Sequence, residues 1–206
     1  MKSVNKVPIW FMRQAGRYLP EYMAIRERER DFLSLCLNPK LAAEIALQPI
    51  RRFDFDFIIL FCDILVIPFA LGQRVSFLKN HGPILDPISS KEDLQYNNYK
   101  ESIKKISNVF DTIQLLNQKK GKRKLIGFCG GPFTILNYMI EGGTSKEHKK
   151  ILTFVQEERE KAKDLIKIIQ EISIEYLKRQ IKHGADYIQV FESWAGLLDG
   201  RLYNEF

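Results

Sequence analysis

The chain has 206 residues, of which 45% are hydrophobic and 28% are charged, and its formal net charge is +7. A chain of this length and composition can bury a sizeable core as one domain, and nothing in it predicts disorder throughout. Its longest apolar runs, such as the one at 57–61, are far too short to span a bilayer. The positive charge suits nucleic acid, an anionic membrane or an acidic small molecule, although lysines spread over helices are also typical of an ordinary solvated surface.

Cysteine and histidine usage predicts neither a disulfide framework nor a metal site. Cys36, Cys62 and Cys129 are an odd number of thiols, placed in or beside apolar segments, which is the pattern of buried, reduced cysteines. There is no C-x-x-C motif, and the three histidines have no metal-ligand spacing. We therefore expect no bound metal.

The first notable stretch begins with a short apolar run at 8–12 that predicts a strand entering the core. Arg13 and Arg17 follow it, and Gly16 between them allows the backbone to approach a ligand closely. Two guanidiniums four residues apart fall on one side of a helical turn or converge across a loop, where they can bind carboxylates or phosphates. Two solvated arginines at the end of a strand are the simpler interpretation.

Further along the chain, apolar runs alternate with amphipathic segments. The runs at 57–61, 124–129 and 186–191 predict buried strands, and the stretch at 74–90 predicts an irregular excursion or a small hairpin. Helical periodicity and capping signals predict helices at 21–32, 39–52, 100–120, 133–140, 146–157 and 158–183, with another starting after Gly196.

Four strands alternating with helices indicate parallel β–α units. An open doubly wound sheet and a closed (β/α)8 barrel of the TIM type are both compatible with this α/β pattern. The barrel is favoured because Arg13, Asp63, Gly130 and Ser193 each follow a predicted strand, where barrels carry their sites, although open sheets also bind ligands there. A full barrel takes about 250 residues. We therefore expect residues 1–206 to be the N-terminal part, about the first half, of a single barrel domain in a larger protein.

Three residues after predicted strands or on helices are candidates for chemistry. Asp63 ends a strongly apolar strand, where an ionised carboxylate without partners costs several kcal/mol, but an aspartate at such a junction often caps a helix. Tyr138 has the alternative interpretation of an aromatic residue on a buried helix face. For Ser193 the alternative interpretation is a turn residue, and the sequence shows no paired base that would make it a nucleophile.

Four motifs carry a family resemblance. They are M-R-Q-A-G-R-Y-L-P-E-Y at 12–22, F-C-D-I-L at 61–65, G-F-C-G-G-P-F-T at 127–134 with N-Y-M at 137–139, and F-E-S-W-A-G at 191–196. In this order they closely resemble the signatures of the uroporphyrinogen decarboxylase family, and together they extend over nearly the whole chain. Two departures are Cys62, where serine is usual, and Asn137, where threonine is usual.

The resemblance implies roles for particular residues. Asp63 would be the central catalytic carboxylate, facing the pyrrole N–H groups of the substrate, with Arg13, Arg17 and Tyr138 as further catalytic side chains. The implied substrate-binding residues are Arg13, Ala15, Arg17, Arg26, Asp63, Tyr138 and Ser193. The family also places a substrate-binding histidine in its C-terminal half, and no segment of this chain matches that region.

The implied activity is the removal, without cofactor or metal, of the four acetate carboxyls of uroporphyrinogen as CO2. The product would be coproporphyrinogen, an intermediate of haem (porphyrin) biosynthesis. The resemblance further implies a homodimer that acts on a free tetrapyrrole, with no nucleic acid and no membrane as partner. The expected location is the cytoplasm, or a plastid if a transit peptide has been removed.

Two other classes of function stay open at this point. A corrinoid-dependent methyltransferase shares the family's fold but uses zinc held by a close cluster of histidine and cysteines, which this sequence lacks. A non-catalytic tetrapyrrole-binding or nucleic-acid-binding protein would use the net charge of +7. Nucleic-acid affinity would fall steeply with salt, and the sequence shows no interleaving of basic and aromatic residues typical of such proteins.

Overall fold

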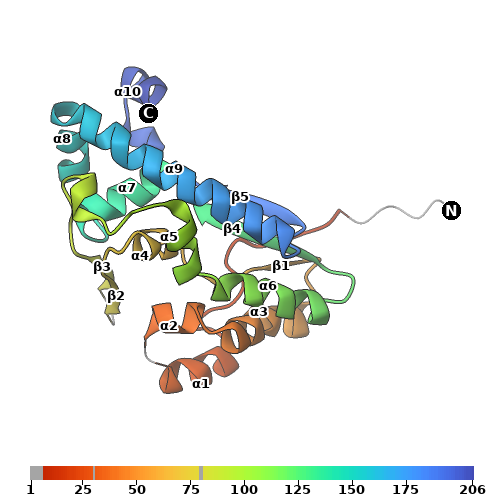
Figure 1. Ribbon diagram of the computed structural model, residues 1–206. Coiled ribbons are helices and arrows are strands. Elements are labelled where there is room, and N and C mark those ends of the chain that lie inside the picture. The colour runs from red at the N-terminus through yellow and green to blue at the C-terminus, as the bar shows by residue number, and fades with distance from the viewer. Residues whose placement is uncertain (1–6, 30, 79–80) are drawn as a thin grey trace.

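The computed structural model describes residues 7–29, 31–78 and 81–206. Its centre is a parallel sheet of three strands, β1 (Phe57–Ile59), β4 (Lys124–Gly130) and β5 (Tyr187–Phe191), in the order β1-β4-β5 (Figure 1). Each of these strands lies beside the next one along the chain, as in the wall of a barrel. The described strands thus confirm a parallel α/β architecture, and their order fits part of a (β/α)8 barrel.

Helices connect the strands and cover one side of the sheet. The long helix α9 (Arg159–Lys182) runs across β4 and β5, and α6 (Asn108–Lys119) lies between α9 and α3 (Pro39–Phe53) (Figure 1). The apolar stripes of these helices meet the buried faces of the strands in one continuous core, since residues such as Ile58, Leu125 and Ile169 are fully buried. This packing fixes the directions in which the strands end.

Two predicted helices are each broken into two. The segment at 21–32 forms α1 (Pro20–Arg28) and the start of α2 (Phe32–Cys36), because Asp31 takes an extended conformation and caps α2 through the Ser34 amide at 2.9 Å. The segment at 100–120 forms α5 (Tyr99–Lys105) and α6, with a turn at 106–107 between them. Helical periodicity predicted the faces of these helices but not the breaks.

The remaining elements extend the frame on either side of the sheet. The stretch at 74–90 does contain a small antiparallel hairpin, made of β2 (Val75–Leu78) and β3 (Gly82–Leu85), although 79–80 lie outside the described residues. The other elements are α4 (Val66–Ala70), α7 (Pro132–Glu141), α8 (Lys149–Glu157), α10 (Gly200–Glu205) and short 3-10 turns at Lys91–Asp93 and Ala195–Leu197. Short α4 was not predicted.

The strand expected at 8–12 is wrong for this structure. Residues 7–14 run as an extended arm without strand pairing, and Ile9 and Phe11 are exposed. The arm is attached to the β1 region by side chains instead: the Ile9 amide donates to Asp56 Oδ2 at 2.8 Å, and the Phe11 ring packs on Phe55 with 5.3 Å between centroids. An apolar run predicts a buried strand only if a neighbouring strand pairs with it, and here side-chain contacts take that place.

Candidate active site

A cleft of about 530 Å³ lies at the carboxyl ends of the parallel strands. It brings together five of the seven residues predicted as site residues, from segments far apart in the sequence: Arg13, Ala15, Asp63, Tyr138 and Ser193. Aromatic side chains form much of the remaining wall, among them Tyr22, Phe32, Phe61, Phe77, Phe128, Phe191 and Trp194. An apolar wall with a few converging polar groups is typical of a site for a large organic ligand.

Asp63 follows β1 and faces into this cleft. Among the described residues its carboxylate has one hydrogen-bond donor, the Leu65 amide at 2.8 Å from Oδ1. Burial raises the pKa of Asp63 above its usual value, and the hydrogen bond from Leu65 only partly opposes this effect. The contact with Leu65 shows that Asp63 supports the turn before α4, but Asp63 does not cap this helix, whose N-cap residue is Leu65 and which has no side-chain cap. The carboxylate nevertheless keeps acceptor capacity for a ligand in the cleft.

Tyr138 lies on α7 with its side chain half-buried beside Asp63. Burial raises the pKa of Tyr138, and the negative charge of Asp63 raises it further, whereas a hydrogen bond with Thr144 and the positive charge of Arg13 lower it. The net effect is upward, so the phenol keeps its proton at neutral pH and can donate a hydrogen bond. The indole of Trp194 packs on the Tyr138 ring with 4.8 Å between centroids and holds it in place.

The turn after β5 is held to the start of α7 by the carboxylate of Glu192. Glu192 accepts hydrogen bonds from the Thr134 amide at 3.2 Å, from the Thr134 hydroxyl, and from the Trp194 and Ala195 amides at 3.1 and 3.2 Å. The Thr134 hydroxyl in turn accepts from the Ser193 amide at 2.8 Å. This network, which we call the Glu192 bracket, fixes the backbone of Ser193 at the edge of the cleft.

Gly131 is required beside the Glu192 bracket. A Cβ built on Gly131 would come within 2.2 Å of the Glu192 carboxylate. The glycine-rich turn predicted from the G-F-C-G-G-P motif therefore has a packing reason in addition to its role in the tight β–α connection. It lets the ends of β4 and β5 approach each other.

The three arginines are arranged unequally around the cleft. Arg13 lines it, whereas Arg17 and Arg26 do not, so the structure leaves these two predicted site residues outside the cleft wall. Both lie close enough to Tyr22 for their charges to lower its pKa, against the larger upward effect of burial. Arg26 also donates to the Glu29 carbonyl at 3.0 Å and stacks 5.3 Å above the ring of Phe32. Since Tyr22 and Phe32 line the cleft, the two cations lie near its wall.

The arginines near the cleft have no carboxylate partner among the described residues and can therefore bind an anion. Within 7–29, 31–78 and 81–206, neither Arg13, Arg17 nor Arg26 forms an ion pair with a carboxylate within 4.0 Å. Other arginines of the same region are paired, as in the two-pronged contact of Arg52 with Glu21 at 2.7 and 2.8 Å. Guanidiniums without a carboxylate partner beside an aromatic cleft suit a ligand that carries several carboxylates.

The cysteines behave partly as predicted. All three are free thiols, and Cys36 and Cys129 are buried, with burial raising the pKa of Cys129 to about 12. Cys62 is the exception, because it is only partly buried and lines the cleft, where its Sγ lies 3.7 Å from the Tyr176 hydroxyl. In the part of the chain that the structure describes, no three histidine, cysteine or acidic side chains converge as metal ligands.

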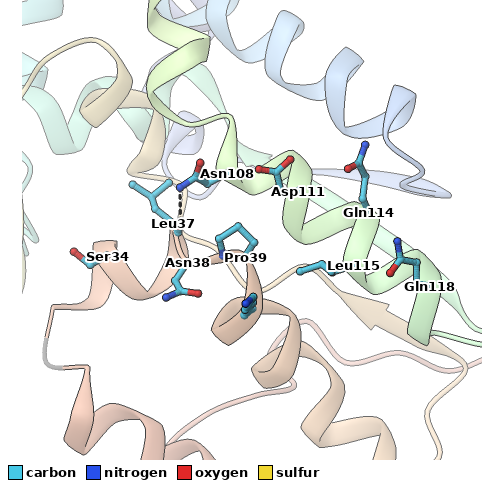
Figure 2. Close-up of a pocket in the computed structure, with 10 residues that line it drawn as sticks. Ser34, Leu37, Asn38, Pro39, Asn108, Asp111, Gln114, Leu115 and Gln118 are labelled. Atoms are coloured by element: carbon cyan, nitrogen blue, oxygen red, sulfur yellow. Dashed lines mark hydrogen bonds between the residues drawn. The ribbon is translucent and has the colours of Figure 1, made fainter.

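A second hollow, of about 740 Å³, lies between the start of α3 and helix α6 (Figure 2). Figure 2 shows polar side chains of α6, including Asn108 and Asp111, facing the turn at Leu37 and Asn38, and Asn108 donates to the Leu37 carbonyl at 2.8 Å. None of the predicted site residues lines this hollow. We therefore place the candidate site in the cleft at the strand ends.

Sequence reasoning missed four residues that build the site: Gln14, Thr134, Glu192 and Trp194. All four stand inside the motifs that carried the resemblance, but a motif shows only that residues occur together. Their roles depend on hydrogen bonds and ring contacts that span, for Thr134 and Glu192, 58 residues of sequence. No local pattern signals such a contact.

The model of the uroporphyrinogen decarboxylase family matches residues 1–206. The chain belongs to the uroporphyrinogen decarboxylase family. Curated relatives include the uroporphyrinogen decarboxylases of Campylobacter jejuni, 46% identical over 207 residues, and of Rickettsia felis, 42% identical over 206 residues. Both alignments cover all of this chain, but only 61% and 59% of the respective relative. The chain thus spans about three-fifths of the length of these family members.

Among solved structures, a methyltransferase from Methanosarcina mazei superposes with a TM-score of 0.77. The match covers 98% of this chain and 59% of the methyltransferase, at 21% sequence identity. At this identity the likeness concerns the fold alone. In the described part of the chain, no helix is both long and apolar enough to cross a membrane.

Proposed function

We propose that the protein carrying this chain is a uroporphyrinogen decarboxylase, a carboxy-lyase that acts without a cofactor. In this proposal residues 1–206 are the N-terminal part of a single (β/α)8 domain and supply one side of the active site. One observation carries the proposal: Asp63, with its pKa raised by burial, shares an aromatic cleft with Arg13, Tyr138 and Ser193. Carboxylates with perturbed pKa values in such clefts are typical of functional sites.

The proposed chemistry begins with protonation of a pyrrole carbon next to an acetate side chain. The resulting cation accepts the electron pair of the bond that breaks when the acetate loses CO2, which leaves an exocyclic methylene. A proton then adds to this methylene to make the methyl group, and the proton first added to the ring carbon leaves, so that the pyrrole is restored and one proton is consumed for each CO2. The substrate brings four pyrrole N–H donors, which would satisfy the free acceptor sites of Asp63 and draw its pKa down on binding. Ionised Asp63 then stabilises the cation more than the neutral ground state, which is differential binding of the transition state.

The other residues of the cleft would hold the substrate in register. Arg13 and Arg17 would bind substrate carboxylates and Arg26 would add positive charge behind Phe32, with the Ala15 backbone close to the ring system. Tyr138 would donate a hydrogen bond to a substrate side chain, supported by its protonated state at neutral pH. Ser193 would bind a carboxylate from the turn that the Glu192 bracket fixes.

Methyl transfer is the rival activity, because the fold likeness to a methyltransferase is compatible with it. A corrinoid-dependent methyltransferase requires zinc, whereas the proposed decarboxylation requires no metal. Activity measured before and after exhaustive chelation separates the two. We further propose that the protein is a homodimer, as the family resemblance implies, and that it is cytoplasmic, because the relatives are bacterial.

The test is an anaerobic assay of the full-length protein with uroporphyrinogen, in which products are oxidised and separated by their number of carboxyls. We expect successive loss of four carboxyls down to coproporphyrinogen, with rates unchanged by chelators. An Asp63→Asn variant that folds normally is the matched control, since it removes the charge and keeps the shape. An intact wild-type protein that leaves the octacarboxylate unchanged would refute the proposal.

A further inference from the structure

The side chain of Gln14 is buried, with 2% exposure, although it stands in the exposed arm between Arg13 and Arg17. Its amide makes two hydrogen bonds to the backbone of β1. Nε2 donates to the Phe57 carbonyl at 2.9 Å, and Oε1 accepts from the Ile59 amide at 3.2 Å. It is unusual for a glutamine whose chain neighbours face solvent to have both the nitrogen and the oxygen of its amide bonded to one strand.

These two bonds lie on the edge of β1 that faces away from β4. In a parallel strand the N–H and C=O of one residue point to the same side, and those of the next residue point to the opposite side. The Leu60 amide donates to the Ile126 carbonyl of β4 at 2.9 Å, so the backbone groups of Leu60 point toward β4. The groups of Phe57 and Ile59 therefore point away from β4. A carboxamide offers one donor and one acceptor with the spacing of a peptide group, so Gln14 takes the place of a neighbouring strand.

The backbone around Gln14 is fixed in the same way. The Tyr18 hydroxyl donates to the Gln14 carbonyl, and the Leu19 amide donates to the Gly16 carbonyl at 3.0 Å, which closes the turn that carries Arg17. Gln14 thus connects a short, internally bonded turn to β1. The cleft-lining Asp63 follows only four residues after Ile59 on the same strand segment.

We propose that Gln14 is a positioning residue that sets Arg13 and Ala15 at a fixed distance from Asp63, so that the substrate carboxylates and the pyrrole nitrogens are bound in one register. This proposal rests on the proposed function for its substrate, but the geometry of the arm is independent of it. Arg13, Gln14 and Ala15 all line the cleft, but both polar atoms of the Gln14 amide are bonded to β1. In this proposal Gln14 therefore acts through its two neighbours, because its own donor and acceptor are engaged by the strand.

A matched control exists at the other side of the sheet. Gln180 of α9 is also fully buried, and its amide likewise makes one accepting and one donating bond to a strand, here both to Phe128 at 2.9 Å. Gln180 stands on a helix and, although Phe128 lines the cleft, neither chain neighbour of Gln180 does. Substituting it removes equivalent hydrogen bonds but leaves the arm in place.

The experiment compares Gln14→Leu and Gln180→Leu in the full-length protein, with Gln14→Glu as a second variant that keeps the shape and one acceptor. Both leucine variants should lose thermal stability to a similar degree. We expect Gln14→Leu to raise KM for uroporphyrinogen about tenfold or more with a smaller effect on kcat, because the arginine turn is no longer aligned. Gln180→Leu should keep KM within about twofold of the wild-type value. Equal KM values in the two leucine variants would overturn the proposal.

Hydrogen exchange gives a second readout that needs no activity. In Gln14→Leu, the amides of Ile9, Leu19 and Ile59, which are hydrogen-bonded in the wild type, should exchange at least tenfold faster, while β4 and β5 stay protected. Unchanged exchange in the arm would refute the positioning role even if activity falls. Faster exchange in a protein whose wild type shows no decarboxylation would keep the positioning role and refute the proposed substrate.

Discussion

Two aspartates at opposite ends of the same parallel sheet differ in almost every respect. Asp186 precedes β5 at the amino end, where it accepts from the Leu125 amide at 2.9 Å, from Lys124 at 3.1 Å and from Lys120. Burial alone would raise the pKa of Asp186, but these hydrogen bonds and the lysine charges lower it overall. Asp63 at the carboxyl end has a single backbone donor among the described residues, and its pKa is raised.

The difference shows how one fold separates stability from chemistry. A carboxylate whose lone pairs are satisfied by the protein stabilises the folded chain and has little left to offer a ligand. A carboxylate left short of donors costs stability, and this cost is recovered when a ligand brings the missing donors. Asp186 is of the first kind, and in the proposed function Asp63 is of the second, in line with the division of labour between the two ends of a (β/α)8 barrel.

The largest effect is expected from Asp63→Asn. Because the charge, and not the shape, would stabilise the pyrrole cation, we expect turnover of uroporphyrinogen by the full-length protein to fall at least about a hundredfold. Steady-state kinetics with folded protein, verified by circular dichroism, measures this. Near-normal turnover would reduce Asp63 to a residue that supports the turn before α4.

Substitutions of Arg17 test whether substrate binding at the cleft end of the sheet needs only a positive charge or also the planar geometry of the guanidinium. Arg17→Lys keeps the charge but not the planar fork, so we expect kcat/KM to fall about tenfold, with Arg17→Ala lower still. Arg17 is exposed and has no ion pair within the described residues, so neither change should move the melting temperature appreciably. Full activity of the lysine variant would show that charge alone suffices and would contradict a two-pronged carboxylate contact.

Glu192 lies at the carboxyl end of the sheet, as Asp63 does, but its carboxylate accepts hydrogen bonds from protein donors, as that of Asp186 does. Glu192→Gln keeps the size and weakens the bracket that fixes Ser193. We expect a loss of about 1–2 kcal/mol in the free energy of unfolding together with a several-fold rise in KM. Denaturant unfolding and kinetics on the same preparation measure both. A variant that loses stability with KM unchanged would separate the bracket from substrate binding.

The smallest effects concern stability and pH, and they should have opposite signs at the two aspartates. Asp186 has a lowered pKa, so its contribution is present above the unfolded carboxyl pKa of about 3.9 and is lost as the pH falls through its folded value. Asp186→Asn should therefore lose about 1 kcal/mol at pH 7, and this difference should vanish in acid.

Asp63 should show the reverse dependence. Its raised pKa means that the folded state binds the proton more tightly than the unfolded state, so ionisation destabilises the fold as the pH rises past that value. Asp63→Asn should melt at a higher temperature than the wild type at pH 7 and at the same temperature below about pH 3. Melting curves across this pH range, without substrate, test both aspartates. A lower melting temperature for Asp63→Asn at pH 7 would contradict the comparison.

By itself the sequence determined the α/β class, the strands at 57–61, 124–129 and 186–191, most helices, and the family. These features follow from local patterns: apolar runs, helical periodicity, and motifs of consecutive residues. It also predicted Asp63 and Ser193 together, because residues that follow parallel strands meet at one end of the sheet. Arg13, which follows an expected strand that does not form, was predicted with Ala15 and Tyr138 from the motifs of the family.

Only the tertiary structure decided which of these residues reach the cleft and what holds them there. It left Arg17 and Arg26 outside the set of residues that line the cleft, turned the expected strand at 8–12 into an arm, and broke two helices. It alone joined Gln14 to β1, across 43 and 45 residues of sequence, and Glu192 to Thr134, across 58. Hydrogen bonds between distant segments depend on where the whole chain brings them, and a sequence pattern a few residues wide carries no information about that.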